Sequence, residues 1–127
     1  MQIKNQKYPK EKDIKYRAYI FAIRVIKFIR KLPRNNYAFE IIVKQLLRSV
    51  TSIGANIIEA QASSSRKDFT NFYHYALKSA NETKVFWLGL LRDSEFFKET
   101  KEVNELLSEA VELSNILGKC IISLKNK

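Results

Sequence analysis

The amino-acid sequence predicts an all-α fold, in which four helices form one antiparallel up-down bundle. Four long segments carry apolar residues at helical spacing, and only short connections separate them. Glycine and proline together fill five of the 127 positions, whereas a β-sandwich or a Rossmann domain needs turn residues at many corners. The length suits one domain over residues 1–127, and no tandem repeat or low-complexity tract divides it.

The first helix is expected over residues 14–32, after a basic segment at residues 1–13 that we expect to be flexible. It ends before Pro33, because proline disfavours helical geometry at the residue that precedes it. One face carries the expected core residues Ile14, Ala18, Phe21, Val25, Ile29 and Leu32. A second apolar side is formed by Tyr16, Tyr19, Ile23 and Ile26. Because a helix with two apolar sides is usually buried on both, this pattern favours self-association.

The second helix is expected over residues 37–62, with Asn35 or Asn36 as its N-cap. Its core positions alternate between spacings of four and three, as in helices packed at a shallow angle: Phe39, Val43, Leu46, Val50, Ile53, Ile57 and Ala60. Away from this seam lie the small residues Thr51, Ser52, Gly54 and Ala55. Small side chains let another helix approach closely, which also favours self-association.

A run of three serines separates the second helix from the third, which is expected over residues 66–91. Ser65 begins an S-x-x-D capping sequence with Asp68. The third helix should bury Phe69, Phe72, Tyr73, Ala76, Ala80, Trp87 and Leu91. After a short connection, the fourth helix is expected over residues 100–124. Its core positions are Val103, Leu106, Ala110, Leu113, Leu117, Cys120 and Leu124.

The positive charge is concentrated in the first quarter of the chain. The formal net charge is +10, to which residues 1–34 contribute +9, residues 35–92 contribute +3 and residues 93–127 contribute −2. A charge of this size favours an acidic partner. The basic end is therefore the first place to look for an anionic ligand.

A stripe of cations runs along the first expected helix. Arg17, Arg24 and Lys31 recur every seven residues, and Lys27 and Arg34 extend the cluster. Such arrays attract phosphate backbones by releasing counterions, without reading base sequence. We therefore expect binding of RNA or DNA without strong sequence specificity. Changing Arg17, Arg24 and Lys31 to glutamate should abolish binding and leave the assembly intact.

Three other interpretations of this surface stay open. The basic face could simply solubilise the protein, and an acidic membrane surface is a further alternative, although the first helix lacks the two-faced pattern of an interfacial helix. From another class, the chain could be a protein–protein adaptor that serves an associated enzyme. In that case the surplus apolar surface would matter more than the charge.

Residue types that support catalysis are sparse. His74 is the only histidine, and the only cysteine, Cys120, falls on a core position, where it behaves as a small hydrophobe. The sequence contains no glycine-rich phosphate loop and no paired-cysteine metal motif. A magnesium site would have to draw on Glu40, Glu59, Asp68 and Glu82, which ion pairs and helix caps explain more simply. We therefore expect no enzymatic activity, no cofactor and no metal site.

The cellular location also follows from composition. A single cysteine argues against a disulfide framework and fits a reducing compartment. The longest uninterrupted apolar run covers only residues 18–23, and the N-terminal stretch is polar and lysine-rich. We therefore expect a cytoplasmic protein without a signal peptide or membrane span.

A strip of polar residues flanks the core seam of the second helix: Gln45, Ser49, Ser52, Asn56 and Glu59. One interpretation is a ladder of hydrogen bonds at a helix–helix boundary, where polar groups fix register. The other is a solvated flank. Neither interpretation requires a substrate.

Three strings in the middle of the chain carry a family resemblance. They are RSVTSIGANIIEA (residues 48–60), SSSRKDF (residues 63–69) and ALKSANETKVFWLGLLRDS (residues 76–94). They resemble the four-helix-bundle proteins encoded in intervening sequences of bacterial large-subunit ribosomal RNA genes. The accessory variability determinant of diversity-generating retroelements belongs to the same group. The resemblance covers about residues 14–124.

The resemblance implies a basic, antiparallel four-helix protomer that assembles into a ring-like homopentamer. It implies no established enzymatic activity, and the retroelement relative is understood to bind nucleic acid and a reverse transcriptase. The motif residues are Arg48, Ser49, Ser52, Asn56, Glu59, Asp68 and Glu82, and we interpret them as packing and interface elements.

Overall fold

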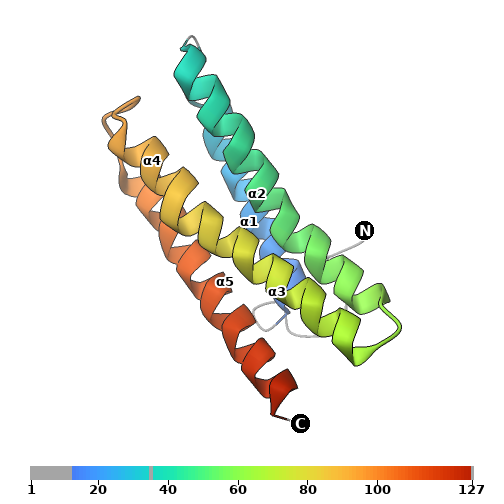
Figure 1. Cartoon of the computed structure of the whole chain (residues 1–127). Helices are drawn as coiled ribbons and strands as arrows, with labels where there is room; N and C mark the ends of the chain where they lie inside the picture. The colour runs from blue at the N-terminus through green and yellow to red at the C-terminus, as the bar shows by residue number, and fades with distance from the viewer. Residues whose placement is uncertain (1–12, 35, 127) are drawn as a thin grey trace.

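A computed structural model describes residues 13–34 and 36–126, and all regular structure in them is helical. The elements, in chain order, are α1 (Ile14–Arg30), α2 (Tyr37–Ala62), α3 (Arg66–Glu82), the π-helical turn η3 (Thr83–Trp87), α4 (Leu88–Asp93) and α5 (Lys101–Lys125). Because α3, η3 and α4 follow one another without a break, they form a single long helix (Figure 1). The described part of the chain therefore consists of four helical rods, and the predicted all-α class is confirmed.

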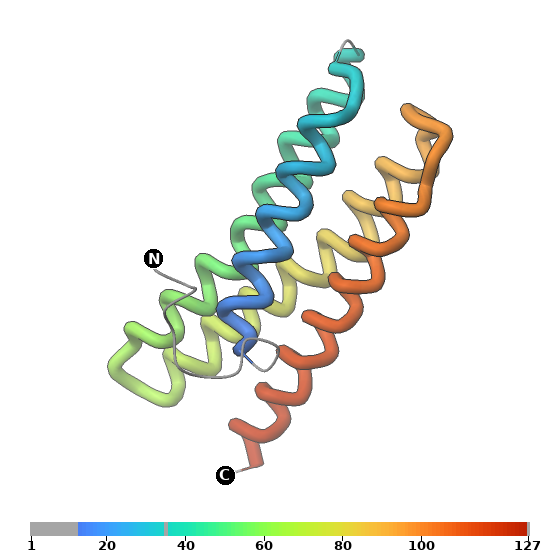
Figure 2. Tube along the Cα trace, turned by 180° about the vertical axis from the view of Figure 1, so that it is seen from behind, coloured from blue at the N-terminus to red at the C-terminus, as the bar shows by residue number. Residues whose placement is uncertain are grey.

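Consecutive rods run antiparallel and lie next to one another. Figures 1 and 2 show α1 rising to the end of the bundle at which α4 lies, α2 returning, α3 to α4 rising again and α5 returning. The α1 helix packs against α2 and α5, and α3 packs against the same two helices. Helices α1 and α3 therefore lie on a diagonal of the up-down arrangement.

Side-chain caps fix where the helices begin. The Oδ1 atom of Asn36 accepts hydrogen bonds from the backbone N–H groups of Ala38 (2.9 Å) and Phe39 (3.2 Å). The hydroxyl of Ser65 accepts a hydrogen bond from the N–H of Asp68 at 3.1 Å. Each bond satisfies a donor that the first helical turn leaves unpaired. The bounds predicted for the second helix and the Ser65 cap are confirmed.

The first helix begins at Ile14, as predicted, but ends earlier than predicted. It ends at Arg30, two residues early, because the N–H groups of Lys31 and Leu32 bond to carbonyls three residues back, at 3.2 and 3.0 Å. Leu32 consequently lies at the edge of the core and is half-buried. The predicted flexible segment lies outside the described residues except for Asp13, whose carboxylate caps α1 by accepting from the Lys15 N–H at 3.1 Å.

The third predicted helix contains a π-helical turn that the sequence did not reveal. Thr83 and Leu88 are both fully buried and lie five positions apart in the chain. In a regular α-helix, successive core positions lie three or four apart. The extra residue rotates Trp87, which was predicted to be buried, to a half-buried position. Leu88 occupies the core in its place, so the Trp87 prediction was wrong by one residue.

The core otherwise follows the predicted seams. All seven predicted core positions of α2 are buried, as are the first five of α5. Cys120 and Leu124 are only half-buried, and Ile121 fills the core in their place, while Phe69 and Phe72 pack on the core rim. The connection before α5 closes one end of the bundle, because Phe96 and Phe97 make edge-to-face contacts with Phe39 (5.3 Å between centroids) and Phe28 (5.6 Å).

Tyr73 gives the core a measurable dependence on pH. Its ring is buried and stacks on Phe69 at 4.8 Å, and this burial raises the pKa of its hydroxyl to about 12, with smaller contributions from Cys120 and Asp13. Because the unfolded pKa is near 10, the folded state favours the neutral phenol. Its stabilising contribution is complete below pH 10 and is lost as the pH rises towards 12, on the order of 2 kcal/mol in total.

We therefore expect the urea midpoint of the wild-type protein to fall more steeply between pH 9.5 and 11.5 than that of Tyr73→Phe. All other ionisable groups are the same in the two proteins, so their effects cancel in the comparison. Parallel pH profiles for the two proteins would show that the Tyr73 hydroxyl is not held neutral by the fold.

Candidate nucleic-acid and self-association surfaces

Some members of the predicted cationic stripe form ion pairs and others do not. Arg17 forms the most buried of these pairs. Its Nε and NH2 atoms donate to the two carboxylate oxygens of Glu109 on α5, at 3.1 and 2.7 Å. The Arg17 and Glu109 side chains are only 24% and 18% exposed. The hydrogen bond to Glu109 raises the pKa of Arg17, against an opposing effect of burial. Arg17 therefore ties α1 to α5 and is poorly placed to meet a phosphate.

Two further members of the stripe form exposed ion pairs. Lys31 Nζ lies 2.5 Å from a carboxylate oxygen of Glu102, and Arg34 makes two hydrogen bonds, at 3.0 and 2.5 Å, to the carboxylate of Glu40. Exposed pairs of this kind contribute little to the stability of a fold, because solvent screens them. Lys31 and Arg34 can therefore exchange these partners for a polyanion at little cost.

The remaining two cations of the stripe, Arg24 and Lys27, are open to solvent, as is Arg30, which the predicted stripe did not include. Arg24, Lys27 and Arg30 are exposed on α1, and none of them forms an ion pair with any of the residues that the structure describes. We call these three residues the α1 cations. Arg30 lies one helical turn beyond Lys27, so its position on the same side of the helix could have been predicted from the sequence. It was missed because it does not belong to the seven-residue repeat of Arg17, Arg24 and Lys31.

A hollow of about 650 Å³ lies between the α1 cations and the start of α5. It is lined by Arg24, Lys27, Lys31, Glu99, Lys101, Glu102, Glu105 and Leu106. Cations of α1 therefore face a mostly acidic stretch at the start of α5 across this hollow. A second, smaller hollow of about 340 Å³ is lined by Lys27, Arg30 and Lys31 alone, and is therefore purely basic.

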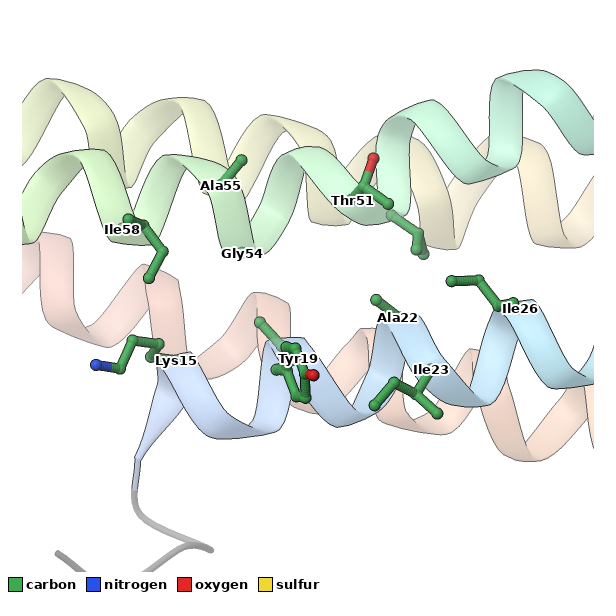
Figure 3. A pocket seen from close by; sticks show the side chains of 11 residues that line it. Lys15, Tyr19, Ala22, Ile23, Ile26, Thr51, Gly54, Ala55 and Ile58 are labelled. Atoms are coloured by element: carbon green, nitrogen blue, oxygen red, sulfur yellow. The ribbon is translucent and has the colours of Figure 1, made fainter. Parts of the chain in front are cut away.

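An apolar groove runs between α1 and α2, and we refer to it by that name below. Its cavity is about 410 Å³, lined by Lys15, Ala18, Tyr19, Ala22, Ile23, Ile26, Val50, Thr51, Gly54, Ala55 and Ile58. Figure 3 shows Ala22 and Ile26 pointing from α1 towards α2, and Ile58 pointing back from α2. A Cβ atom on Gly54 would lie only 3.7 Å from the Cβ of Ala18, so the two helices approach closely at the floor of the groove.

The groove combines two surfaces that were predicted separately from the sequence, one on each helix. The second apolar side of the first helix supplies Tyr19, Ile23 and Ile26, and the small residues of the second helix supply Thr51, Gly54 and Ala55. Tyr16 and Ser52, which were grouped with them, do not line it. The structure thus brings the two predicted self-association patches together on one face.

Two of the family-motif residues connect α2 to the π-turn region. The Arg48 guanidinium donates to the carboxylate of Glu82 and, through Nε, to Gln45 Oε1 at 2.8 Å. The same Glu82 oxygen accepts a hydrogen bond from the Trp87 indole N–H at 2.5 Å. Glu82 therefore holds an arginine of α2 and a tryptophan of η3 at once.

A buried pair of hydroxyls lies beside this network. Ser49 Oγ and Thr83 Oγ1 are 2.8 Å apart, and each also lies within hydrogen-bond distance of a backbone carbonyl, Leu46 for Ser49 and Ser79 for Thr83. Because each hydroxyl has one proton, one of them donates to the other hydroxyl, which in turn donates to its carbonyl. Both residues are fully buried. Because a buried hydroxyl costs about 1–3 kcal/mol when it loses its partner, the pair fixes the register of α2 against η3.

The rest of the polar strip and of the motif acts locally. The Ser52 hydroxyl donates to the Arg48 carbonyl, the Asn56 amide donates to the Ser52 carbonyl, and Glu59 is exposed. Asp68 lies in the capped first turn of α3. The strip is thus a helix–helix boundary at Ser49 and a solvated flank at Glu59, so each of the two interpretations holds for one part.

The residues considered for catalysis are dispersed. His74 and Cys120 are half-buried on α3 and α5, and burial raises the pKa of the Cys120 thiol. Glu40 and Glu82 are held by arginines. Within residues 13–34 and 36–126, no three His, Cys, Asp or Glu side chains are close enough together to hold a metal ion.

Among the described helices, α2 alone is long and apolar enough to cross a membrane on grounds of length and composition. Its seam lines the bundle core and its small residues line the apolar groove. These two roles account for its apolar composition within the bundle.

Comparisons with known proteins agree on one group. A family model described as 23S rRNA-intervening sequence protein matches residues 10–119. A solved structure, a protein of unknown function from the S23 ribosomal protein family of Bacteroides thetaiotaomicron, is 34% identical with a TM-score of 0.71. The match covers 86% of this chain and 98% of that one. A search of curated proteins gave no significant match.

Proposed function

We propose a function for this chain as a member of the 23S rRNA-intervening sequence protein family, to which it belongs. It is a self-associating, non-enzymatic protein that binds RNA or DNA. The family predicted from the three sequence strings is confirmed by the match. The observation that carries the proposal is the group of α1 cations, which face solvent together on one helix. We infer that they bind phosphates without reading bases, because lysine and arginine side chains attract the nucleic-acid backbone by charge, whatever the base sequence.

The ion pairs of the other basic residues decide which of them can take part in binding. Lys31 and Arg34 support the α1 cations, since their ion pairs are exposed and readily exchanged. Arg17 is assigned to the fold, because reversing its charge would set two carboxylates against each other between α1 and α5. The glutamate variant at Arg17, Arg24 and Lys31 expected from the sequence would therefore confuse loss of binding with loss of stability.

Self-association supports binding by repeating one weak cationic surface. Three cations per protomer give modest affinity, but a ring-like homo-oligomer would present several such sets to one polynucleotide. The family resemblance implies five subunits. The apolar groove supports association, because an open apolar face of this kind on a protein surface commonly marks an interaction site.

An adaptor role is the second candidate, and the same apolar groove favours it. In that case the groove would receive a different polypeptide, and the cations would serve solubility. Co-purification of a specific protein that survives nuclease treatment would favour the adaptor, whereas retention of nuclease-sensitive polynucleotide would favour the first proposal.

The test is a filter-binding titration of the wild-type protein against a generic polynucleotide, from 50 to 300 mM salt. Neutralising three phosphates per protomer predicts a slope of log K against log salt of about −2 to −3 for one protomer, and a steeper slope for an assembly. Light scattering before and after nuclease treatment reports the subunit number alongside. A slope near zero would show that phosphate contacts do not drive binding.

A further inference from the structure

The π-turn presents two large apolar side chains to solvent. Val85 is 71% exposed and Phe86 is 52% exposed, and they are adjacent on η3. We call this pair the apolar knob. Exposed apolar residues are common when they occur singly, but here two lie together on a turn of uncommon geometry. Turns of this kind often occur at functional sites.

The knob is held in place by the residues beneath it. Thr83 anchors the turn through its buried hydrogen bond to Ser49, and Glu82 fixes Trp87. The Phe86 ring rests edge-on against Trp87 with 4.8 Å between their centroids. These contacts hold the backbone of the turn and the Phe86 ring in place, which lowers the entropy cost of docking them into another surface.

The knob and the apolar groove lie on different parts of one molecule. The groove is formed by α1 and α2, whereas the knob lies on the rod that packs against α2 and α5, diagonally across from α1. A knob cannot reach the groove of its own chain. Two unlike, complementary patches on one chain produce a head-to-tail contact, which closes into a ring when the rotation between copies allows it.

We propose that the apolar knob of one copy docks into the apolar groove of the next copy. This inference rests on the self-association proposed above and specifies its contact surfaces. The groove has small residues at its floor, where Ala18, Ala22 and Gly54 leave room, and apolar walls at Tyr19 and Ile58. Lys15, at one end, is its only charged lining residue. Its chemistry therefore matches an uncharged pair such as valine and phenylalanine.

In this arrangement the family motif has an indirect role in assembly. Arg48, Ser49 and Glu82 do not touch the groove, but they hold the turn that displays the knob. They are positioning residues for the contact. This gives the motif an interface role that does not require its side chains to lie in the interface.

The first test compares assembly of matched variants by size-exclusion chromatography with light scattering. Val85→Gln/Phe86→Gln removes the knob, and Ala55→Glu places a charge in the groove. Each is expected to reduce the wild-type assembly to a species of about 15 kDa. The controls are Ile122→Gln, at another exposed apolar position, and Ala62→Glu, at the exposed end of α2, and both should assemble as wild type. Circular dichroism verifies that every variant is helical.

The second test traps the contact with a disulfide in a Cys120→Ser background. Val85→Cys alone and Ala55→Cys alone are expected to give no cross-linked dimer on mild oxidation, whereas an equal mixture is expected to give one. Dimerisation of Ala55→Cys alone would indicate a symmetric groove-to-groove contact and overturn the inference.

The outcomes separate this inference from the proposal beneath it. If the wild-type protein is a monomer at 100 μM, self-association fails and the inference fails with it. If the wild-type protein assembles and Val85→Gln/Phe86→Gln still assembles, only the knob-in-groove contact is wrong. In that case nucleic-acid binding by an oligomer would stand unchanged.

Discussion

Deleting Val85 is expected to leave the bundle folded, whereas deleting Lys78 from the same long helix is expected to destabilise it. Removing one residue from the π-turn places Leu88 four positions after Thr83 and Leu91 seven positions after it. These are the core spacings of a regular α-helix. The turn would relax to α-helical geometry, and both leucines would stay buried.

Deletion of Lys78, an exposed residue before the turn, cannot be absorbed completely. If the π-turn is kept, Leu88 and Leu91 rotate by about 100° out of the core, and exposing them costs about 3–6 kcal/mol. If the turn relaxes instead, both leucines stay buried, but Ala80 and Thr83, which lie between the deletion and the extra residue of the turn, rotate out of the core. Ser49 then loses its buried hydroxyl partner, at a cost of about 1–3 kcal/mol.

Urea unfolding followed by circular dichroism measures this difference. We expect the Val85 deletion to unfold near the wild-type urea midpoint and the Lys78 deletion to unfold at a clearly lower one. Because the Val85 deletion also removes part of the apolar knob, folding and assembly must be read separately in the same samples. Equal loss of structure in the two deletions would show that the π-turn is not the site of an inserted residue.

The contrast between α2 and α3 shows what a sequence can predict about this fold. The α2 core follows unbroken spacings of four and three between a capping asparagine and a serine run, so periodicity alone located its bounds and its buried face. The π-turn has no comparable local signal. It is held by the Ser49–Thr83 hydroxyl pair and by Glu82, contacts between residues far apart in the chain that no local pattern contains.

Contacts between residues far apart in the chain also decide which cations of the first helix are free to bind a ligand. Periodicity placed Arg17, Arg24 and Lys31 in one stripe, yet Glu109 lies 92 residues after Arg17 and selects it as a partner only in the folded bundle. Which cations remain open thus depends on how α5 packs against α1. The apolar groove was easier to predict from the sequence. Each of its two walls is a run of apolar or small residues within a single helix, so only the contact between the two helices had to be inferred.

Neutralising the α1 cations should weaken polynucleotide binding by two orders of magnitude or more. The variant is Arg24→Gln/Lys27→Gln/Arg30→Gln, in which glutamine keeps the helix and adds no charge beside Glu102 and Glu105. If each cation neutralises one phosphate, the counterion relation makes each contact worth about 5- to 8-fold in affinity at 0.1 M salt. Three lost contacts then lower the affinity roughly 100- to 500-fold, and the salt slope becomes shallower by about 2 to 3.

A control with the same charge change distinguishes local contact from net charge. Lys67, Lys119 and Lys125 are also exposed and lie on α3 and α5, towards the other end of the bundle. Their triple glutamine variant removes three positive charges without touching α1. Under the proposal this control keeps most of the affinity and most of the salt slope, because phosphates bind where cations gather on one surface. Equal losses in both variants would mean that only the overall charge attracts the polyanion, and α1 would cease to be a binding site.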